Sequence, residues 1–331
     1  MNTGWMRFLT ALCSLWCGAA LAQVSPVVVL EVQTENVVVY AGDVVEPSRF
    51  ATVANATTAA TRTFGTSLLI GDITAVNGRP AKGTAMINQR TINLRTTATA
   101  GLAIADVVRN AISDYALEIL QPDGTPIGSI YASGFSAGPA PPGANSAVTG
   151  SNNAVIGGTG AFLGARGQLG AGQTTVANRI ASVTEDPSNR RINGGGKFTI
   201  LVQLIPLSRP EIAATATGSA VFHADFTPVS SARPARSGEL LIVTASGLGP
   251  TRPGVNPGTA FPQDPLQEVN SPVEVVVGSR AAEVVNKIGW PGTVDMFRID
   301  FRIPEGIAPG VATVQLISAF IPGPEARIPV Q

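Results

Sequence analysis

Hydrophobic and polar residues alternate along much of this chain. In residues 197–205, Phe198, Ile200, Val202 and Leu204 share one face of an extended strand. In residues 297–303 the alternation is strict, with hydrophobic residues at every odd position and charged residues between them. A period of two is typical of β-strands that are buried on one face. The pattern therefore predicts an all-β protein built from antiparallel strands.

Further short hydrophobic runs, bounded by Gly, Pro and Asn turns, predict more strands. They cover residues 27–32, 37–40, 67–73, 83–94, 116–120, 127–131, 174–184, 219–223, 239–245, 273–277 and 312–318. Residues 51–66, rich in Ala and Thr, fit either a strand or a loose surface segment. Residues 102–115 instead place Ile104, Val108, Ile112 and Tyr115 at helical spacing, which predicts one helix on the flank or mouth of the fold.

The densest motif lies in residues 152–168, where an apolar run leads into glycines. The motif residues are Gly157, Gly158, Thr159, Gly160, Gly164 and Gly167. A dinucleotide-binding loop needs a helix directly after its glycines, and this stretch contains too many glycines to form one. We therefore expect a β-hairpin at a barrel corner, where glycines let the strand bend and Phe162 turn inward.

This motif resembles the GGTG-x-aromatic-x-x-Ala-Arg-Gly signature of the dirigent and allene oxide cyclase-like barrel family. The resemblance covers about residues 27–206 and is strongest over 150–205. It implies an antiparallel barrel of about eight strands with an apolar cavity. It also implies a homo-oligomer, since barrels of this family often assemble as trimers. It also makes Arg166 and Phe162 candidate ligand-binding residues of that cavity. A structural arginine that pairs with a carboxylate or with carbonyls is the alternative for Arg166.

The second half carries a different set of motifs: residues 245–251 (ASGLGPT), 258–262 (GTAFP), 270–275 (NSPVEV) and 301–306 (FRIPEG). They resemble the Solibacter-type C-terminal domain found on exported acidobacterial proteins. The resemblance covers about residues 213–331 and brings no known chemistry. Together with the strand spacing it implies an immunoglobulin-like β-sandwich.

The N-terminus has the pattern of a secretory signal peptide. Arg7 precedes an apolar run, and Ala20-Leu21-Ala22 is a small-x-small cleavage site. We predict cleavage after Ala22 and a secreted or periplasmic protein, whose only cysteines, Cys13 and Cys17, are removed with the signal. The expected organisation is a signal peptide (1–22), a barrel domain (23–206), a linker (207–212) and a sandwich domain (213–331). After cleavage no remaining stretch has the length and hydrophobicity of a membrane span.

Charge and catalytic motifs exclude several functions. Lys plus Arg and Asp plus Glu both number 22, so there is no basic excess for nucleic acid. The single histidine, His223, excludes a multi-histidine zinc site, and we expect no metal and no cofactor. His223 oriented by Asp225 is one candidate base, and a structural histidine is the alternative. Paired carboxylates in the barrel form another candidate, which the sequence cannot place: Glu31, Glu35, Asp43, Asp72, Asp106, Asp114 and Glu118.

These observations predict an exported, non-catalytic binding or cell-surface interaction protein. Its barrel would hold a small apolar ligand, and its C-terminal domain would bind a cell-surface or protein partner. The alternative is a dirigent-like or cyclase-like protein that steers a coupling or cyclisation reaction inside the barrel. Such a role depends on the shape of a cavity more than on acids and bases, so missing catalytic motifs do not exclude it.

Overall fold

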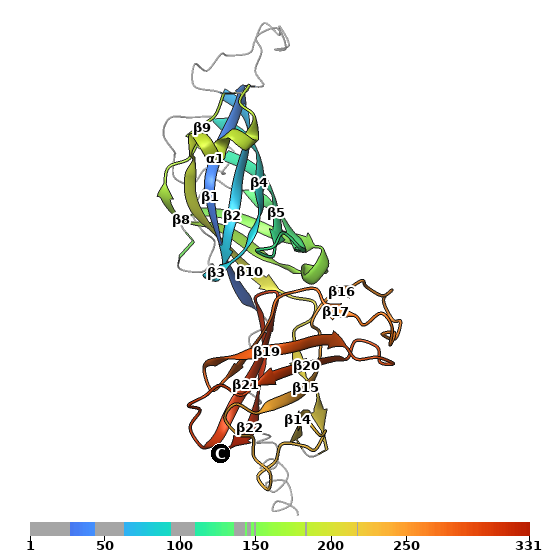
Figure 1. The fold of residues 1–331 in the computed structure, drawn as a ribbon. Helices are drawn as coiled ribbons and strands as arrows, with labels where there is room; N and C mark the ends of the chain where they lie inside the picture. The colour runs from blue at the N-terminus through green and yellow to red at the C-terminus, as the bar shows by residue number, and fades with distance from the viewer. Residues whose placement is uncertain are drawn as a thin grey trace, which may run out of the picture.

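The computed structural model of the chain is built almost wholly from β-strands, which form two large sheets (Figure 1). It describes residues 27–43, 63–93, 110–135, 143, 147–148, 150–182, 184–216 and 218–331. The all-β prediction is confirmed. The expected signal peptide, with both cysteines, lies outside the described residues, as does most of the Ala- and Thr-rich segment 51–66. Within the described chain, no helix combines the length and hydrophobicity that crossing a bilayer requires.

The first sheet closes into a barrel of eight antiparallel strands. They are β1 (Val28–Asp43), β2 (Thr63–Val76), β4 (Lys82–Asn93), β5 (Asn110–Leu120), β6 (Pro126–Phe135), β7 (Gly150–Gly158), β8 (Arg166–Val176) and β10 (Gly196–Ile205). Each strand pairs with the next in this order, and β1 closes the barrel by pairing with both β10 and β2. The predicted strand 197–205 is therefore the last barrel strand, with Phe198, Ile200, Val202 and Leu204 all buried.

Strand β1 joins two segments that the sequence divides. Residues 27–32 and 37–40 were expected as separate strands, because polar residues separate them. They form one strand whose register shifts between Thr34 and Val37, where Asn36 adopts a positive φ of 54°. Such a bulge lets a long barrel strand bend without ending.

The predicted helix at residues 102–115 is wrong where the structure describes it. Residues 110–115 belong to β5, and residues 102–109 lie outside the described residues. Ala111, Ser113 and Tyr115 point into the barrel with at most 5% exposure, whereas Ile112 is 41% exposed. Buried residues continue at every second position as far as Ile119, as expected for a strand. The spacing of Ile112 and Tyr115 relative to the upstream apolar residues matched a helical period only by chance.

A polar excursion crosses the outside of β1 and β2 before β10 begins. It contains β9 (Arg179–Ile180), η4 (Pro187–Asn189) and α1 (Arg190–Asn193). The carboxylate of Asp72 on β2 accepts hydrogen bonds from Arg190 at 2.5 Å and from Arg191 at 2.7 and 3.0 Å. Asn36 donates a further bond of 3.1 Å to the same carboxylate. Asp72, one of the carboxylates that the sequence could not place, therefore anchors the excursion.

The second sheet has seven main strands in the order β11-β15-β20-β19-β18-β21-β22 and folds over on itself to give a sandwich-like body. Their bounds are β11 (Glu211–Ile212), β15 (Leu240–Ser246), β20 (Phe297–Arg302), β19 (Arg280–Gly289), β18 (Val273–Val277), β21 (Gly310–Ser318) and β22 (Ile321–Val330). Shorter strands accompany them: β12 (Ala214–Thr215), β13 (Gly218–Ser219), β14 (Val221–His223), β16 (Thr251–Arg252) and β17 (Glu268–Val269). As the alternation predicts, Phe297, Ile299, Phe301 and Ile303 are buried in its core. No expected strand covered β19 or β22.

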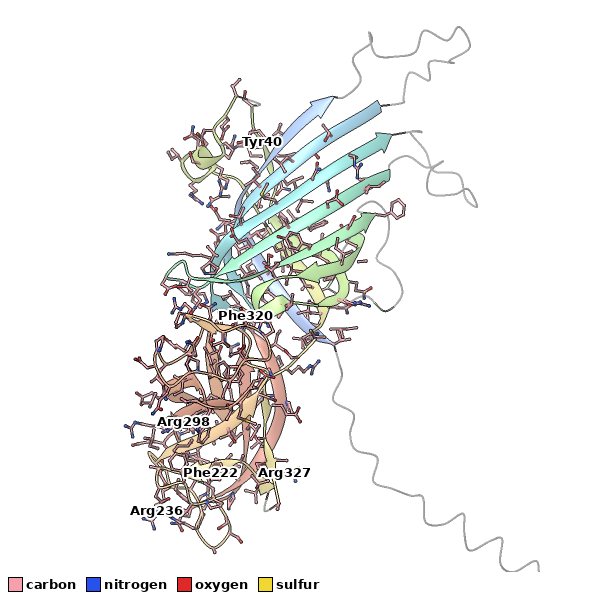
Figure 2. All side chains as sticks on the ribbon, turned by 90° about the vertical axis from the view of Figure 1, so that its right-hand side faces the viewer. Tyr40, Phe222, Arg236, Arg298, Phe320 and Arg327 are labelled. Atoms are coloured by element: carbon pink, nitrogen blue, oxygen red, sulfur yellow. The ribbon has the colours of Figure 1, made fainter. Side chains whose placement is uncertain are left out.

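The sandwich closes one end of the barrel. The turn between β21 and β22 carries Ala319, Phe320 and Ile321 into the same hydrophobic cluster as the barrel core, and Figure 2 places Phe320 at the junction. Around it, the Asn270 amide donates a 2.7 Å hydrogen bond to the carbonyl of Pro126, and Gln121 donates one of 2.6 Å to the carbonyl of Asn270. Arg79 of β3 (Arg79–Pro80) and Glu274 of β18 form an ion pair across the junction. Hydrophobic burial and polar contacts therefore fix the two bodies to each other.

Candidate functional site

The glycine-rich motif forms the barrel corner that its sequence predicts. Strand β7 ends at Gly158, a single 3-10 turn η3 (Gly160–Phe162) follows, and β8 starts at Arg166. Three helical residues do not provide the long helix that a dinucleotide loop requires. Phe162 turns inward and is 1% exposed within the barrel core.

Arg166 does not reach the barrel interior, so its expected place in a cavity is corrected. Leu169 on β8 points inward and is buried, so Gly167 shares its face while Arg166 and Gln168 point outward. The Arg166 side chain is exposed on the outer wall opposite Ile205. Phe162, the other candidate ligand residue, fills the core where a ligand was expected.

The glycines of the motif serve close packing and backbone bending. A Cβ on Gly158 would lie 2.4 Å from the carbonyl oxygen of Phe162, and one on Gly160 would lie 2.4 Å from that of Ile127. Gly160 and Gly164 also have positive φ values of 60° and 69°, which favour glycine. Gly157 has no atom near its Cβ position. The motif therefore locks η3 against β6.

The barrel interior also holds a small polar cluster farther from the sandwich. Tyr115 of β5 hydrogen-bonds with Ser151 and Asn153 of β7. Burial raises the pKa of the Tyr115 phenol, and these two hydrogen bonds partly offset that rise, so the phenol stays protonated at neutral pH. The Oδ1 atom of Asn153 is buried with no hydrogen-bond partner. A buried amide oxygen without a partner is unusual. A hydrogen-bond donor of a bound molecule would satisfy it.

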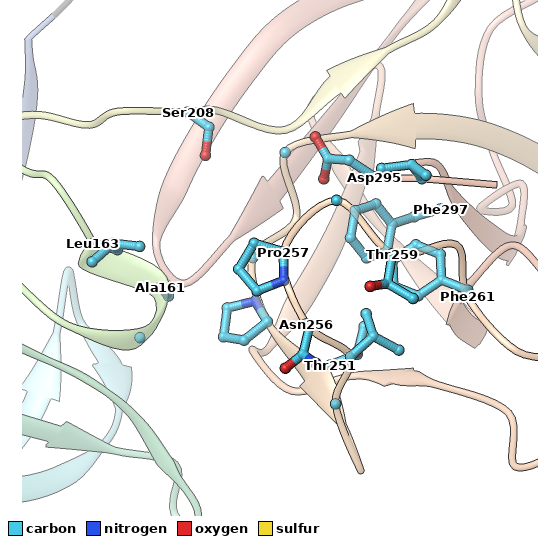
Figure 3. Close-up of a pocket in the computed structure, with 18 of the residues that line it drawn as sticks. Ala161, Leu163, Ser208, Thr251, Asn256, Pro257, Thr259, Phe261, Asp295 and Phe297 are labelled. Atoms are coloured by element: carbon cyan, nitrogen blue, oxygen red, sulfur yellow. The ribbon is translucent and has the colours of Figure 1, made fainter.

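A cavity of about 420 Å³ lies on the outside of the barrel, between η3 and the sandwich (Figure 3). Four separate segments line it: residues 160–163 of the barrel corner, 207–208 of the connection, 247–261 after β15, and 294–297 before and within β20. In Figure 3, Ala161, Leu163 and Ser208 face Pro257, Asn256 and Thr259 across the opening. We call this cavity the interdomain cleft.

Exposed hydrophobic side chains surround the interdomain cleft. Leu163 is 65% exposed, Leu207 is 73% exposed and Val294 is 53% exposed, and all three line the cavity. Phe261 and Phe297, packed with ring centres 5.2 Å apart, form part of its wall. Polar side chains are few, namely Ser208, Thr251, Asn256, Thr259 and Asp295. An apolar concave site with a few polar groups at its edge is the usual form of a small-molecule site.

A buried glutamine holds the loop that forms one wall of the interdomain cleft. Gln267 is 2% exposed, and its Oε1 accepts hydrogen bonds from the Gly254 amide at 2.7 Å and from the Thr251 hydroxyl at 3.2 Å. Its Nε2 donates to the carbonyl of Pro265 at 3.1 Å. The loop is therefore preorganised, which reduces the entropy that a ligand must lose on binding.

His223 is a structural residue, and Asp225 does not orient it. The ring is 2% exposed, with Nδ1 2.6 Å from Glu239 Oε1 and Nε2 3.1 Å from the carbonyl of Arg233. Asp225 instead binds Thr227 and Arg233. Both imidazole nitrogens are thus occupied by protein groups, and neither can take a proton from a substrate. Among the described residues no cluster of three or more His, Cys, Asp or Glu could hold a metal ion.

The interdomain cleft could not be predicted from the sequence, because four segments distant in the chain line it. The one sequence feature that relates to the cleft is the high Gly and Pro content of residues 247–262. It predicts a loop but does not indicate which segments the loop faces. A scan against models of known protein families and a search of curated proteins both find no match to this chain.

Proposed function

We propose that this chain is an exported binding protein that holds a small apolar molecule in the interdomain cleft. The observation that carries the proposal is the ring of three exposed hydrophobic side chains, Leu163, Leu207 and Val294, at the mouth of a cavity of about 420 Å³. Contiguous exposed apolar surface around a concavity is a mark of binding sites. The volume is within the range that small-molecule sites occupy, roughly 300–1,000 Å³.

The cleft lining offers one carboxylate with no second titratable partner, which favours binding over catalysis. The one carboxylate that lines it, Asp295, has no histidine, lysine or second carboxylate beside it among the lining residues. General acid–base chemistry needs such a partner within hydrogen-bond reach of the reacting group. Export is a part of this proposal that rests on the signal-peptide pattern of residues 1–22. The dirigent-like and Solibacter-type relationships and assembly into a trimer are parts that rest on sequence resemblance alone.

Titration with N-phenyl-1-naphthylamine, a neutral apolar dye that fluoresces in apolar surroundings, tests the proposal. We expect saturable binding by the wild type and at least tenfold weaker binding by Leu163→Asp, because a carboxylate in an apolar site loses its hydration. Leu266→Asp is the matched control, since Leu266 is 53% exposed and lies outside the lining of the cleft. No dye binding, or equal binding by both variants, would refute the proposal.

A second candidate function is the steering of a coupling or cyclisation reaction inside the barrel. It is favoured by the polar cluster of Tyr115, Ser151 and Asn153, with its unpaired amide oxygen, in a barrel core made mainly of hydrophobic side chains. A protonated phenol there would donate a hydrogen bond to a carbonyl or ether oxygen of a guest molecule. Under this alternative, Tyr115→Phe would weaken dye binding or product selectivity while Leu163→Asp would not. The opposite result supports the interdomain cleft.

A further inference from the structure

Phe226 has an unusual backbone conformation and an exposed ring. It lies in the tight turn after β14, closed by hydrogen bonds from the Phe226 amide to the carbonyl of His223 and from the His223 amide to the carbonyl of Thr227, both 2.9 Å. Its φ is 62°, in the left-handed region that bulky residues rarely adopt. The side chain is nevertheless 48% exposed, so burial of the ring does not explain the choice of Phe. Strained positions of this kind concentrate at functional sites.

The ring of Phe226 belongs to an ordered surface group. Trp290 lies with its ring centre 6.0 Å away, at an interplanar angle of 48°. The guanidinium of Arg298 lies 5.4 Å from the centre of the Phe226 ring. We call Phe226, Trp290 and Arg298 the aromatic platform. It lies on the outer face of the sheet, because Arg298 alternates with the buried Phe297 and Ile299 along β20.

Planar polar groups surround the aromatic platform and hold each other in place. Arg298 makes two hydrogen bonds to Asp300, of 2.8 and 3.0 Å, and Asn286 donates to the same carboxylate at 3.4 Å. Asp225, on the turn itself, pairs with Arg233 at 2.8 Å. Guanidinium, carboxylate and amide groups offer directional donors and acceptors suited to hydroxyl groups.

The charged side chains around the aromatic platform form ion pairs. Arg298 is balanced by Asp300, and Arg233 by Asp225, so no surplus of either sign is presented to a ligand. A nucleic acid or an acidic polymer would need a basic excess. A neutral ligand with one apolar face and many hydroxyls complements a surface that combines aromatic rings with paired polar groups.

We propose that the aromatic platform binds the sugar rings of a neutral polysaccharide. Because the two aromatic planes are inclined by 48°, the apolar C–H face of one pyranose ring would stack on Phe226 and that of a neighbouring sugar ring would pack against Trp290. The hydroxyls at the edges of these sugar rings would bond to Arg298 and to the polar groups of the turn. Figure 2 shows Arg298 on the side of the sandwich, farther from the barrel than Phe320 at the junction. The platform therefore gives the exported chain an attachment site that does not depend on the interdomain cleft.

Affinity gel electrophoresis with soluble polysaccharides tests this assignment. The neutral probes are hydroxyethylcellulose, glucomannan and laminarin, and the acidic probes are alginate and polygalacturonate. We expect at least one neutral polymer to retard the wild-type chain, and Phe226→Ala and Trp290→Ala to weaken its association constant tenfold or more. Phe135→Ala is the matched control, since Phe135 is 45% exposed on the outer wall of the barrel. It should be retarded like the wild type.

Phe226→Gly separates binding from folding. Glycine adopts a positive φ without strain, so this variant should keep or raise the melting temperature while losing retardation. Retardation only by acidic polymers, equal retardation of wild type and Phe226→Gly, or no retardation by any neutral polymer would overturn the assignment. So would self-association of the wild type that Phe226→Gly abolishes, since the platform would then bind a second copy of the chain.

Discussion

Phe320, in the sandwich turn between β21 and β22, and Phe162, in η3 of the barrel, are buried in one hydrophobic cluster. The barrel core thus includes side chains from both bodies. The two walls of the interdomain cleft belong to the two bodies that this cluster joins, so their spacing depends on it. A cleft with fixed walls binds a rigid ligand with a smaller loss of entropy.

Replacing Phe320 by Ala should destabilise the whole chain. Phe320 is 5% exposed, and truncation of a buried Phe typically costs about 3–5 kcal/mol through lost burial and the remaining cavity. Urea unfolding followed by circular dichroism measures the loss. Val311→Ala is the control, because Val311 is 73% exposed and its truncation should change stability by less than about 0.5 kcal/mol. A similar small effect at Phe320 would show that the junction is not part of the core.

The two neighbouring glycines of the motif should respond differently to alanine. In Gly158→Ala the new Cβ would lie 2.4 Å from Phe162 O and 2.7 Å from Ser129 O, both backbone atoms that cannot move aside cheaply. We expect a loss of about 1–3 kcal/mol from overpacking. Gly157→Ala meets no atom within 4 Å and should be neutral or slightly stabilising, because alanine restricts the unfolded chain. Thermal unfolding of both variants compares them, and equal effects would contradict close packing at Gly158.

The ion cluster at Asp72 should make stability depend on acid pH. Burial raises the pKa of the Asp72 carboxyl, but hydrogen bonds from Arg191, Asn36 and Arg190 outweigh it, and the net pKa lies below the ordinary value of 3.8. A carboxyl whose pKa is lower in the folded state contributes stability above its unfolded pKa and loses it as the pH falls through the folded value. The contribution of Asp72 is therefore complete at neutral pH, begins to fall below about pH 4 and is lost only below the lowered folded pKa.

Asp72→Asn should accordingly destabilise the chain at pH 7, on the order of 3 kcal/mol, because two arginines lose their shared carboxylate. As the pH falls below about 4, the ordinary carboxyl pKa, the difference between the variant and the wild type should shrink, because the wild-type carboxylate becomes protonated. Asp264→Asn, at an exposed position, is the control and should follow the wild type across the range. Urea unfolding at a series of pH values measures both. A difference between wild type and Asp72→Asn that does not shrink in acid would exclude the ion cluster as its cause.

His223 should be inert in the folded protein. Because it is the single histidine of the chain, diethylpyrocarbonate modification of a tag-free sample reports on this ring alone. At 2% exposure, with both nitrogens hydrogen-bonded, it should react at least tenfold more slowly than in urea-unfolded protein. Fast modification of the folded chain would contradict this structural role and support His223 as a candidate base.

The sequence could predict most strands because barrel and sandwich strands bury one face. Phe198 to Leu204 and Phe297 to Ile303 have their predicted faces inward. It failed at residues 110–115, where apolar residues happened to match two periods at once. In β19, Ala281, Glu283 and Val285 are exposed while Ala282 and Val284 are half-buried, so hydrophobic residues occur on both faces and the strand carries no clear alternation.

Much less of the candidate site could be predicted from the sequence. Phe162 could be placed inward from the glycines around it, but the direction of Arg166 depends on the register of β8, which begins only after η3. The interdomain cleft depends on how the fold brings Leu163, Leu207 and Val294 to one cavity, and no local pattern encodes the arrangement of segments so far apart. A single exposed leucine is common on protein surfaces. Three exposed hydrophobic residues indicate a binding site only when the fold shows that they line one cavity.

The most direct test is a crystal structure of the purified protein grown with N-phenyl-1-naphthylamine. We expect electron density for the dye between Leu163, Leu207 and Val294, in contact with the loop that Gln267 holds. Density inside the barrel beside Tyr115, with the interdomain cleft empty, would contradict the proposed function and support the reaction-steering alternative.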